Sequence, residues 1–236
     1  MSDETTLATA GLTPVAVADE RLSLHRSGAL WWEERRTLVV ADLHLEKGSS
    51  FARGRQFLPP YDTAATLSRL AEAVDALAPR RVIALGDSFH DRHGPGRLQP
   101  ADAARLAALV TGCDWLWITG NHDPELPSAL GGTVAAEAEI GGLTFRHEPK
   151  PGAAPGEIAG HLHPAARVVG RGRSLRRRCF AATAERMVLP AFGALTGGLN
   201  VLDSAFAAIL PRAHLRVHLI GADRLYAVAA GGLAGG

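Results

Sequence analysis

The sequence predicts an α+β (α/β) fold, a four-layer αββα sandwich of two mixed β-sheets flanked by helices. In the first half, short β-branched runs alternate with amphipathic helices, which is typical of a largely parallel sheet. From about residue 133, short strand-like segments separated by Gly or Pro indicate a second, mostly antiparallel sheet. Because both sheets have apolar faces to bury, we expect them to pack against each other, with helices outside.

The first half of the chain alternates between expected strands and expected helices. Strands are expected near residues 22–25, 29–33, 36–41, 81–85 and 114–119. A helix is expected from Asp62, a suitable N-cap, to Leu77, because leucine and valine recur every three or four residues on one face. Pro79 ends this helix, and the segment PADAARLAALV predicts a second one.

The second half is expected to contain strands in the segments AAEAEI, LTFRH, EIAGHLH, ARVVG, RRCFAAT and RMVLP. The Gly- and Pro-rich segment EPKPGAAPGE is short enough to be a hairpin loop. Since no long linker separates the halves, residues 1–236 are expected to form one domain.

Composition limits the classes of partner. A net charge of +1 means that any polyanion must be held by a local patch of charge. Cys113 and Cys179 are too few and too far apart for a disulfide framework, which suits a reducing compartment. The polar, acidic N-terminal segment lacks the features of a secretory signal, so we expect a cytoplasmic protein. The apolar segment 188–211 is interrupted by Gly, Pro, Asn and Asp, so no membrane role is expected.

Five short motifs fall at the ends of expected strands: ADLH, LGDSFHD, TGNHD, FRH and GHLH. They supply the candidate site residues Asp42, His44, Asp87, Asp91, Asn121, His122, His147, His161 and His163. Because ligands bind beyond the strand ends of open α/β sheets, we expect these side chains to converge. Asp42 and His44 are two residues apart, and in extended chain they would project to the same side; the same holds for the pair in GHLH.

The candidate ligands are carboxylates, imidazoles and one amide, without a thiolate, and this set favours Mn, Fe or Zn over a softer metal. Seven such groups exceed what one ion binds, so two divalent ions bridged by a carboxylate are expected. Singly, each residue could serve the fold alone: His147 as a hydrogen-bonded strand residue, Asp42 as a turn former. The joint pattern favours the metal site.

These motifs, in this order over roughly residues 38–165, resemble the calcineurin-like metallophosphoesterase superfamily. The resemblance implies a first metal held by Asp42, His44, Asp87 and His163. It implies a second metal held by Asp87, Asn121, His147 and His161, with Asp87 as the bridge. It also implies that His122 points past the metals toward the substrate.

The motif LGDSFHD departs from the family pattern, which usually has Asp or Asn three residues after the first Asp. Here His90 takes that place and Asp91 follows it. Either Asp91 hydrogen-bonds His122 and orients it, or His90 contacts the second shell of the metals, and the spacing does not decide between them.

The two-metal interpretation implies a mechanism for phosphodiester hydrolysis. A hydroxide that bridges the metals would be the nucleophile in an in-line displacement at phosphorus. The leaving alkoxide needs a proton, and His122 is the expected donor.

At a finer level, three segments look similar to the bacterial ligase-associated DNA damage response endonucleases: DLHLEKGSSFARGRQFLPPYDTAATLSRL, LGDSFHD and LPAFGALTGG. This similarity implies an enzyme of DNA repair that cuts phosphodiesters in DNA beside a DNA ligase, a helicase and an exonuclease. Mn²⁺ is the expected ion, with Fe or Zn as alternatives.

Two basic stretches bear on a DNA substrate. Arg53 and Arg55 lie in an expected Gly- and Pro-rich loop, where they either reach substrate phosphates or are simply solvated. The run RGRSLRRR contains five arginines between Arg171 and Arg178. It is a DNA-binding feature if it lies beside the metal site, and otherwise a solvated hairpin. Few aromatic residues are available for base stacking, the nearest being Phe51, Phe57, Tyr61 and Phe89, and such residues are more often part of the core.

Two alternatives belong to other functional classes. A phosphoesterase of a small nucleotide or cyclic phosphodiester would need few basic groups outside its pocket. A non-catalytic scaffold of a repair assembly would have no need of every ligand and His122, and the sequence keeps them all.

Overall fold

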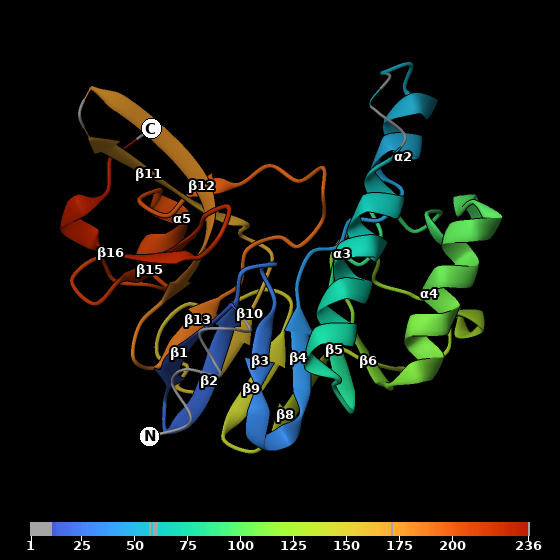
Figure 1. The fold of residues 1–236 in the computed structure, drawn as a ribbon, viewed down its shortest axis with the longest axis horizontal. Helices are drawn as coiled ribbons and strands as arrows, with labels where there is room; N and C mark the ends of the chain where they lie inside the picture. Colours follow the sequence, from blue (N-terminus) through green and yellow to red (C-terminus); the bar gives the residue numbers. More distant parts are fainter. Residues whose placement is uncertain (1–10, 57, 59–60, 171, 236) are drawn as a thin grey trace.

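The structure is a computed structural model that describes residues 11–56, 58, 61–170 and 172–235. Phe57, a candidate for base stacking, and Arg171, the first arginine of the basic run, lie outside the described residues. Two mixed β-sheets pack together, and helices α3 and α4 cover one side of the molecule (Figure 1). The predicted fold class, a sandwich of two mixed sheets with helices, is therefore confirmed.

The first sheet has seven strands in the order β1-β2-β3-β4-β5-β6-β7. They are β1 (Leu12–Val17), β2 (Glu20–His25), β3 (Leu30–Trp32), β4 (Thr37–Val40), β5 (Arg81–Leu85), β6 (Asp114–Ile118) and β7 (Thr133–Ala135). The strands from β4 to β7 are parallel neighbours, as predicted, whereas β1 to β4 are antiparallel. Strand β1 was not predicted from the sequence.

The second sheet has nine strands, with β14-β11-β12-β13-β10-β9-β8 as its main path and β15 and β16 beside β12. They are β8 (Glu137–Ile140), β9 (Leu143–Arg146), β10 (Glu157–Ala159), β11 (Pro164–Gly170), β12 (Arg173–Ala182), β13 (Arg186–Val188), β14 (Leu199–Asn200), β15 (Arg216–Ile220) and β16 (Leu225–Ala229). The segment EPKPGAAPGE links β9 to β10, which are parallel neighbours. The prediction of a hairpin loop there was wrong, because parallel strands need a crossover connection.

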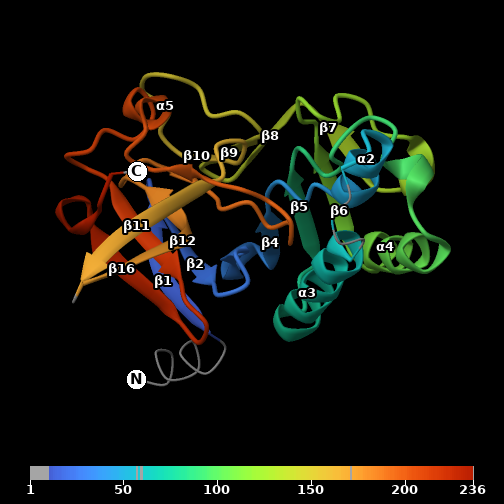
Figure 2. The same cartoon turned by 90° about the horizontal axis from the view of Figure 1, so that it is seen from above.

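Three apolar clusters hold the layers together. One lies between the sheets and joins Val39 and Ile83 of the first to Phe145 and Phe180 of the second. Another packs the outer face of the first sheet against the helices α3 (Asp62–Leu77) and α4 (Pro100–Gly112). The third covers the second sheet near the short helix α5 (Ser204–Ala207), on the side away from α3 (Figure 2).

Helix α3 has the predicted bounds, but its first residue has a different task from the one expected. The N-cap is Tyr61, and the Asp62 carboxylate instead accepts a hydrogen bond of 3.0 Å from the backbone N–H of Gly48. Gly48 lies in the first turn of α2 (Lys47–Arg53), a helix that was not predicted. Arg53 is therefore the last residue of a helix, and only Arg55 lies in the turn beyond it, with a left-handed φ of 59°.

Four short 3-10 helices complete the described secondary structure: η1 (Glu33–Arg35), η2 (Pro95–Arg97), η3 (Ser128–Leu130) and η4 (Ala230–Gly232). Within the part of the chain that the structure describes, no helix has both the length and the apolar character needed to cross a bilayer.

Candidate metal centre and active site

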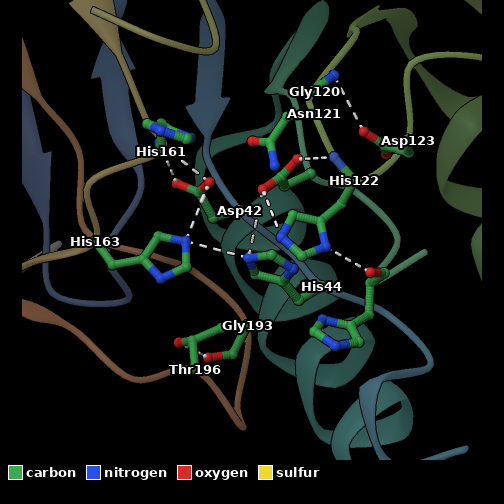
Figure 3. A network of polar contacts seen from close by, with 12 residues as sticks. Asp42, His44, Gly120, Asn121, His122, Asp123, His161, His163, Gly193 and Thr196 are labelled. Carbon is green, nitrogen blue, oxygen red and sulfur yellow. Dashed lines mark hydrogen bonds and ion pairs between the residues drawn. The ribbon is translucent and has the colours of Figure 1, made fainter. Parts of the chain in front are cut away.

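The predicted ligands meet where strands of both sheets end. Asp42 and His44 follow β4, and Asp87 follows β5. From the other strands come Asn121 after β6, His147 after β9, and His161 and His163 after β10. Figure 3 shows Asp42, His44, Asn121, His161 and His163 around one centre. The convergence expected from the motifs is thus present in the structure.

The backbone brings them there in a way that the spacing argument did not foresee. Asp42 and His44 have left-handed φ angles of 53° and 43°, and His161 and His163 have 68° and 45°. These pairs therefore project from tightly turned loops and not from extended strand. A non-glycine residue in this region costs on the order of 1 kcal/mol, and such conformations persist where the surrounding structure fixes them.

One group of donors comprises Asp42, His44 and His163. The Nε2 atoms of His44 and His163 are 3.1 Å apart, and His163 Nε2 is 3.3 Å from Asp42 Oδ1. His44 and Asp42 are almost fully buried. Burial, followed by the proximity of His163, lowers the pKa of His44 to about 2, so its imidazole is a neutral donor.

A second group surrounds His147. Its Nε2 is 3.0 Å from Asn121 Oδ1, 3.1 Å from His161 Nδ1 and 3.3 Å from Asp87 Oδ1. The Nδ1–H of His147 donates to the Leu85 carbonyl at 3.0 Å, which directs Nε2 into the site. Asp87 joins the two groups, because its other carboxylate oxygen lies 3.8 Å from His44 Nε2.

These spacings fit divalent metals. Two ligands at about 2.1 Å from one ion and at right angles to each other lie about 3 Å apart. The contacts within each group, 3.0 to 3.3 Å, have this length. Each group thus offers nitrogen and oxygen donors at the spacing of ligands around one ion, so the residues present suit one ion per group.

The charges of the centre are strongly coupled. Burial opposes ionisation of both Asp87 and His147, but their mutual hydrogen bond and charge outweigh it. The pKa of Asp87 is lowered to about 2, and that of His147 is raised to about 9, with Asp42 contributing. In the metal-free protein His147 therefore carries a proton that a metal must displace.

Two motif glycines are required by the close packing of the centre. A Cβ on Gly120 would lie 2.2 Å from the backbone N and from Oδ1 of Asp87. Gly86 has a φ of 69°, and a Cβ there would lie 2.5 Å from the His147 ring. These contacts explain the glycines of TGNHD and LGDSFHD as spaces left for ligands.

His122 lies beside the two groups. Its Nδ1–H donates to the His90 carbonyl at 2.7 Å, and its Nε2 is 3.9 Å from Asp87 Oδ2. Its backbone N–H donates to Asp87 Oδ1 at 2.9 Å. The side chain is 38 % exposed, so its free nitrogen is open to a bound substrate.

The residue that the sequence left open, His90, belongs to the same place. Its ring stacks on that of His122, with centroids 5.1 Å apart, and lies edge-on to His44 at 5.5 Å. One ring nitrogen from each of His44, His90 and His122 lies within 4.8 Å of the others. His90 thus extends the cluster of imidazoles beyond the two groups of expected ligands.

Asp91, in contrast, faces away from His122. Its carboxylate accepts hydrogen bonds of 2.8 and 2.7 Å from the Arg97 guanidinium and one of 2.8 Å from the His93 backbone N–H. The Arg97 hydrogen bond holds the pKa of Asp91 well below its usual range. The orientation of His122 comes from the His90 carbonyl, not from the carboxylate expected to supply it.

Sequence reasoning missed the supporting role of Asp123, the last residue of TGNHD. This fully buried carboxylate accepts hydrogen bonds from the backbone N–H groups of Gly120 and Phe89, at 3.1 and 3.0 Å. It therefore ties the loop after β6 to the loop after β5. Burial raises the pKa of Asp123 to about 6. The signal was present as the acidic residue that ends the motif.

The segment 190–199, which contains most of LPAFGALTGG, connects the loop that carries Asp42 to the loop that carries His163. The Gly193 N–H donates to the Asp42 carbonyl at 3.1 Å, and the Leu199 N–H donates to the His163 carbonyl at 3.0 Å. Figure 3 shows Gly193 and Thr196 beside the centre. This segment therefore spans between the ligand loops of the two sheets.

Part of the arginine run holds this segment in place. Arg178 donates to the Ala191 carbonyl at 2.6 Å, and Arg176 donates to the Gly198 carbonyl. Arg173 and Arg177 are exposed, and strand alternation places them on the opposite face of β12. From Arg173 on, the run thus forms one strand of the antiparallel β11–β12 hairpin, with two different faces.

The aromatic residues considered for stacking have separate environments. Phe89 is fully buried, Phe51 lies 5.5 Å from the His90 ring, and Tyr61 is 72 % exposed.

A cavity of about 860 Å³ near Arg186 and Arg216 lies at the other end of the second sheet, and none of the predicted ligands lines it.

The sandwich fold and the clustered imidazole, carboxylate and amide donors define a metal-binding hydrolase of phosphate esters. The comparisons agree with this class. The family model described as calcineurin-like phosphoesterase matches residues 35–176. This chain therefore belongs to the calcineurin-like phosphoesterases.

Two solved structures are similar to most of this chain. A crystal structure of the nuclease MPE from Pseudomonas putida is 31 % identical, with a TM-score of 0.70, over 92 % of this chain and 100 % of that one. A phosphoesterase from E. coli, Yfce, is 16 % identical, with a TM-score of 0.42, over 82 % of this chain and 98 % of the other. No curated protein sequence matches this chain significantly.

Proposed function

We propose that this protein is a phosphodiesterase that uses two divalent metal ions to cut DNA, as an endonuclease of bacterial DNA repair. The observation that carries the proposal is the pair of three-donor groups, joined through Asp87, with the free nitrogen of His122 beside them. The similarity to a nuclease over nearly the full chain supports a nucleic-acid substrate.

The residues divide into two sets of metal ligands and a neighbouring imidazole, that of His122, which faces the substrate. Asp42, His44 and His163 would hold one ion, and Asn121, His147 and His161 the other, with Asp87 between them. When bound, the ions supply positive charge at the phosphate and the acidity that activates a water molecule. The donors are hard or intermediate, without thiolate, so we propose Mn²⁺, with Fe or Zn as alternatives.

His122 is the proposed proton donor to the leaving oxygen. Its Nδ1–H is held by the His90 carbonyl, so the proton in question is at Nε2, the atom that faces the centre. The His90 ring stacks on the His122 ring, and this contact limits the rotation of His122.

The rival functions have less support. A scaffold would have no need of the glycines that leave space for ligands, or of the left-handed backbone at Asp42 and Asp87. An enzyme of a small nucleotide or cyclic diester remains the second candidate. Association with a DNA ligase, a helicase and an exonuclease stays a prediction, testable by co-purification from cells.

The test is an assay of metal-depleted protein to which Mn²⁺ is returned. Bis-p-nitrophenyl phosphate should be compared with single-stranded, nicked and duplex DNA. We expect hydrolysis of the small diester and internal cuts in at least one DNA. Hydrolysis of the small diester and of small nucleotides with no DNA cleavage would favour the second candidate.

A further inference from the structure

A basic groove lies beside the loop that carries His90, which is the neighbour of His122. This cavity of about 470 Å³ is lined by Arg53, Arg92, His93, Gly96, Arg97 and Pro127, among others. Its volume is within the range of about 300 to 1,000 Å³ that is usual for small-ligand sites. None of its lining residues is acidic. The groove is therefore a concave surface of one charge sign.

Residues on both sides of the groove lie close to His90, either along the chain or in space. On one side, Arg92 and His93 follow His90 directly along the chain. On the other, the Phe51 ring in α2 lies 5.5 Å from the His90 ring, and Arg53 ends the same helix. Since His90 stacks on His122, these contacts connect the groove to the proposed proton donor.

The four basic residues of the groove differ in what they are free to bind. Arg97 is committed to the fold, because Asp91 binds it with both oxygens and its Nε donates to Ser49 in α2 at 2.9 Å. Arg53, Arg92 and His93 are exposed. Among the residues that the structure describes, no acidic side chain pairs with Arg53 or Arg92. Their guanidinium groups are therefore available to bind a ligand.

We propose that this groove binds the phosphate next to the scissile one in a DNA strand, on the leaving-group side of the cut. An arginine guanidinium matches a phosphate in geometry and charge. The side follows from His122, the proposed proton donor to the leaving oxygen, because the stacked His90 ring links it to the loop that lines the groove. This inference rests on the proposed function and adds a subsite to it.

Binding tests the groove without any need for cleavage. The variant Arg53→Ala/Arg92→Ala should bind a fluorescent single-stranded oligonucleotide, in EDTA, roughly tenfold more weakly than the wild type. The slope of log affinity against log salt should become shallower by about 0.7 for each lost contact. Arg80→Ala/Arg212→Ala is the matched control, because both arginines are exposed and lie beyond the opposite strand ends, before β5 and β15.

Cleavage of dinucleotides tests the position of the subsite. The dinucleotide TpT has a single diester, and it can carry an additional terminal phosphate at either its 5′ or its 3′ end. The products show which nucleoside leaves. Adding the phosphate on the leaving side should raise kcat/KM in the wild type and in Arg53→Lys/Arg92→Lys, and much less in Arg53→Ala/Arg92→Ala.

The outcomes separate this inference from the proposed function. Equal DNA affinity of the wild type, the groove variant and the control would contradict the proposal that the groove binds a DNA phosphate. So would equal losses of affinity in both variants. A benefit from the added phosphate only on the other side would also overturn it. If DNA binds through these arginines but no DNA or dinucleotide is cut, the proposed function fails and the groove stands as a DNA-binding site.

Discussion

The substitution His122→Ala separates proton donation from metal binding. The hydrogen bond from this residue to a predicted ligand is donated by its backbone N–H to Asp87 Oδ1 at 2.9 Å, and alanine keeps it. Its imidazole Nε2 lies 3.9 Å from Asp87 Oδ2, which is too far for a hydrogen bond. The side chain is 38 % exposed and makes one hydrogen bond, to the His90 carbonyl. Its loss should reduce the free energy of unfolding by only about 1 kcal/mol. The metal content should therefore stay near that of the wild type.

The catalytic effect should be much larger than the structural one. Loss of a positioned general acid slows turnover by roughly 10²- to 10⁴-fold, which is about 2.7 to 5.4 kcal/mol in the barrier. The poor alkoxide leaving group of DNA should show the full effect. The p-nitrophenolate of bis-p-nitrophenyl phosphate departs without a proton, so its hydrolysis should slow far less.

Bound metal, measured by mass spectrometry, and rates on both substrates decide the role of His122. The matched variant is His122→Asn, which retains a polar side chain at this position but provides no group that titrates near neutral pH. It should show the same loss on DNA. Equal slowing on both substrates together with loss of metal would make His122 a ligand and refute the reasoning.

Three further predictions follow from the contacts of the centre. Asp87→Asn should lower the metal content and abolish activity, because an amide neutralises neither ion; metal analysis that finds full occupancy would contradict its role as the link between the groups. In the metal-free protein the pKa of His147 is about 9, above the ordinary 6.5, so the stability that its protonated form contributes is complete below pH 6.5 and is lost as the pH rises through 9. Mn²⁺ affinity measured by calorimetry should accordingly increase over this window with release of protons, and a flat profile would contradict the assignment. Arg178→Ala should reduce the free energy of unfolding by roughly 1.5 to 3 kcal/mol in denaturant titrations, because a partly buried charged hydrogen bond to Ala191 is lost, whereas exposed Arg173→Ala should have no effect. Equal stability of both variants would show that Arg178 does not secure the segment 190–199.

Local sequence signals predicted the elements whose causes are local. Helix α3 begins and ends at the predicted residues, because its apolar spacing and the proline after it are encoded within the helix itself. The donor set was predicted for a similar reason, since metal-ligating side chains at the ends of several strands indicate one shared site. Strand β1 was missed because its pairing with β2, and not its own pattern, defines it.

What the sequence could not predict depends on contacts between distant segments. The left-handed turn at His161 is accompanied by a hydrogen bond from its N–H to the Asp42 carboxylate, 119 residues away. Asp91 pairs with Arg97 and not with His122, and spacing alone contains no information on that choice. The division of the arginine run into two faces likewise depends on where the segment 190–199 passes.

The central claim is that two metal ions act together in this centre on DNA. Metal-depleted protein should be titrated with Mn²⁺ while bound metal per chain and DNA cleavage are followed in the same samples. We predict two ions per chain, with cleavage appearing only as the second site fills. Cleavage that is complete at one ion per chain, or that persists after exhaustive chelation, would contradict the account.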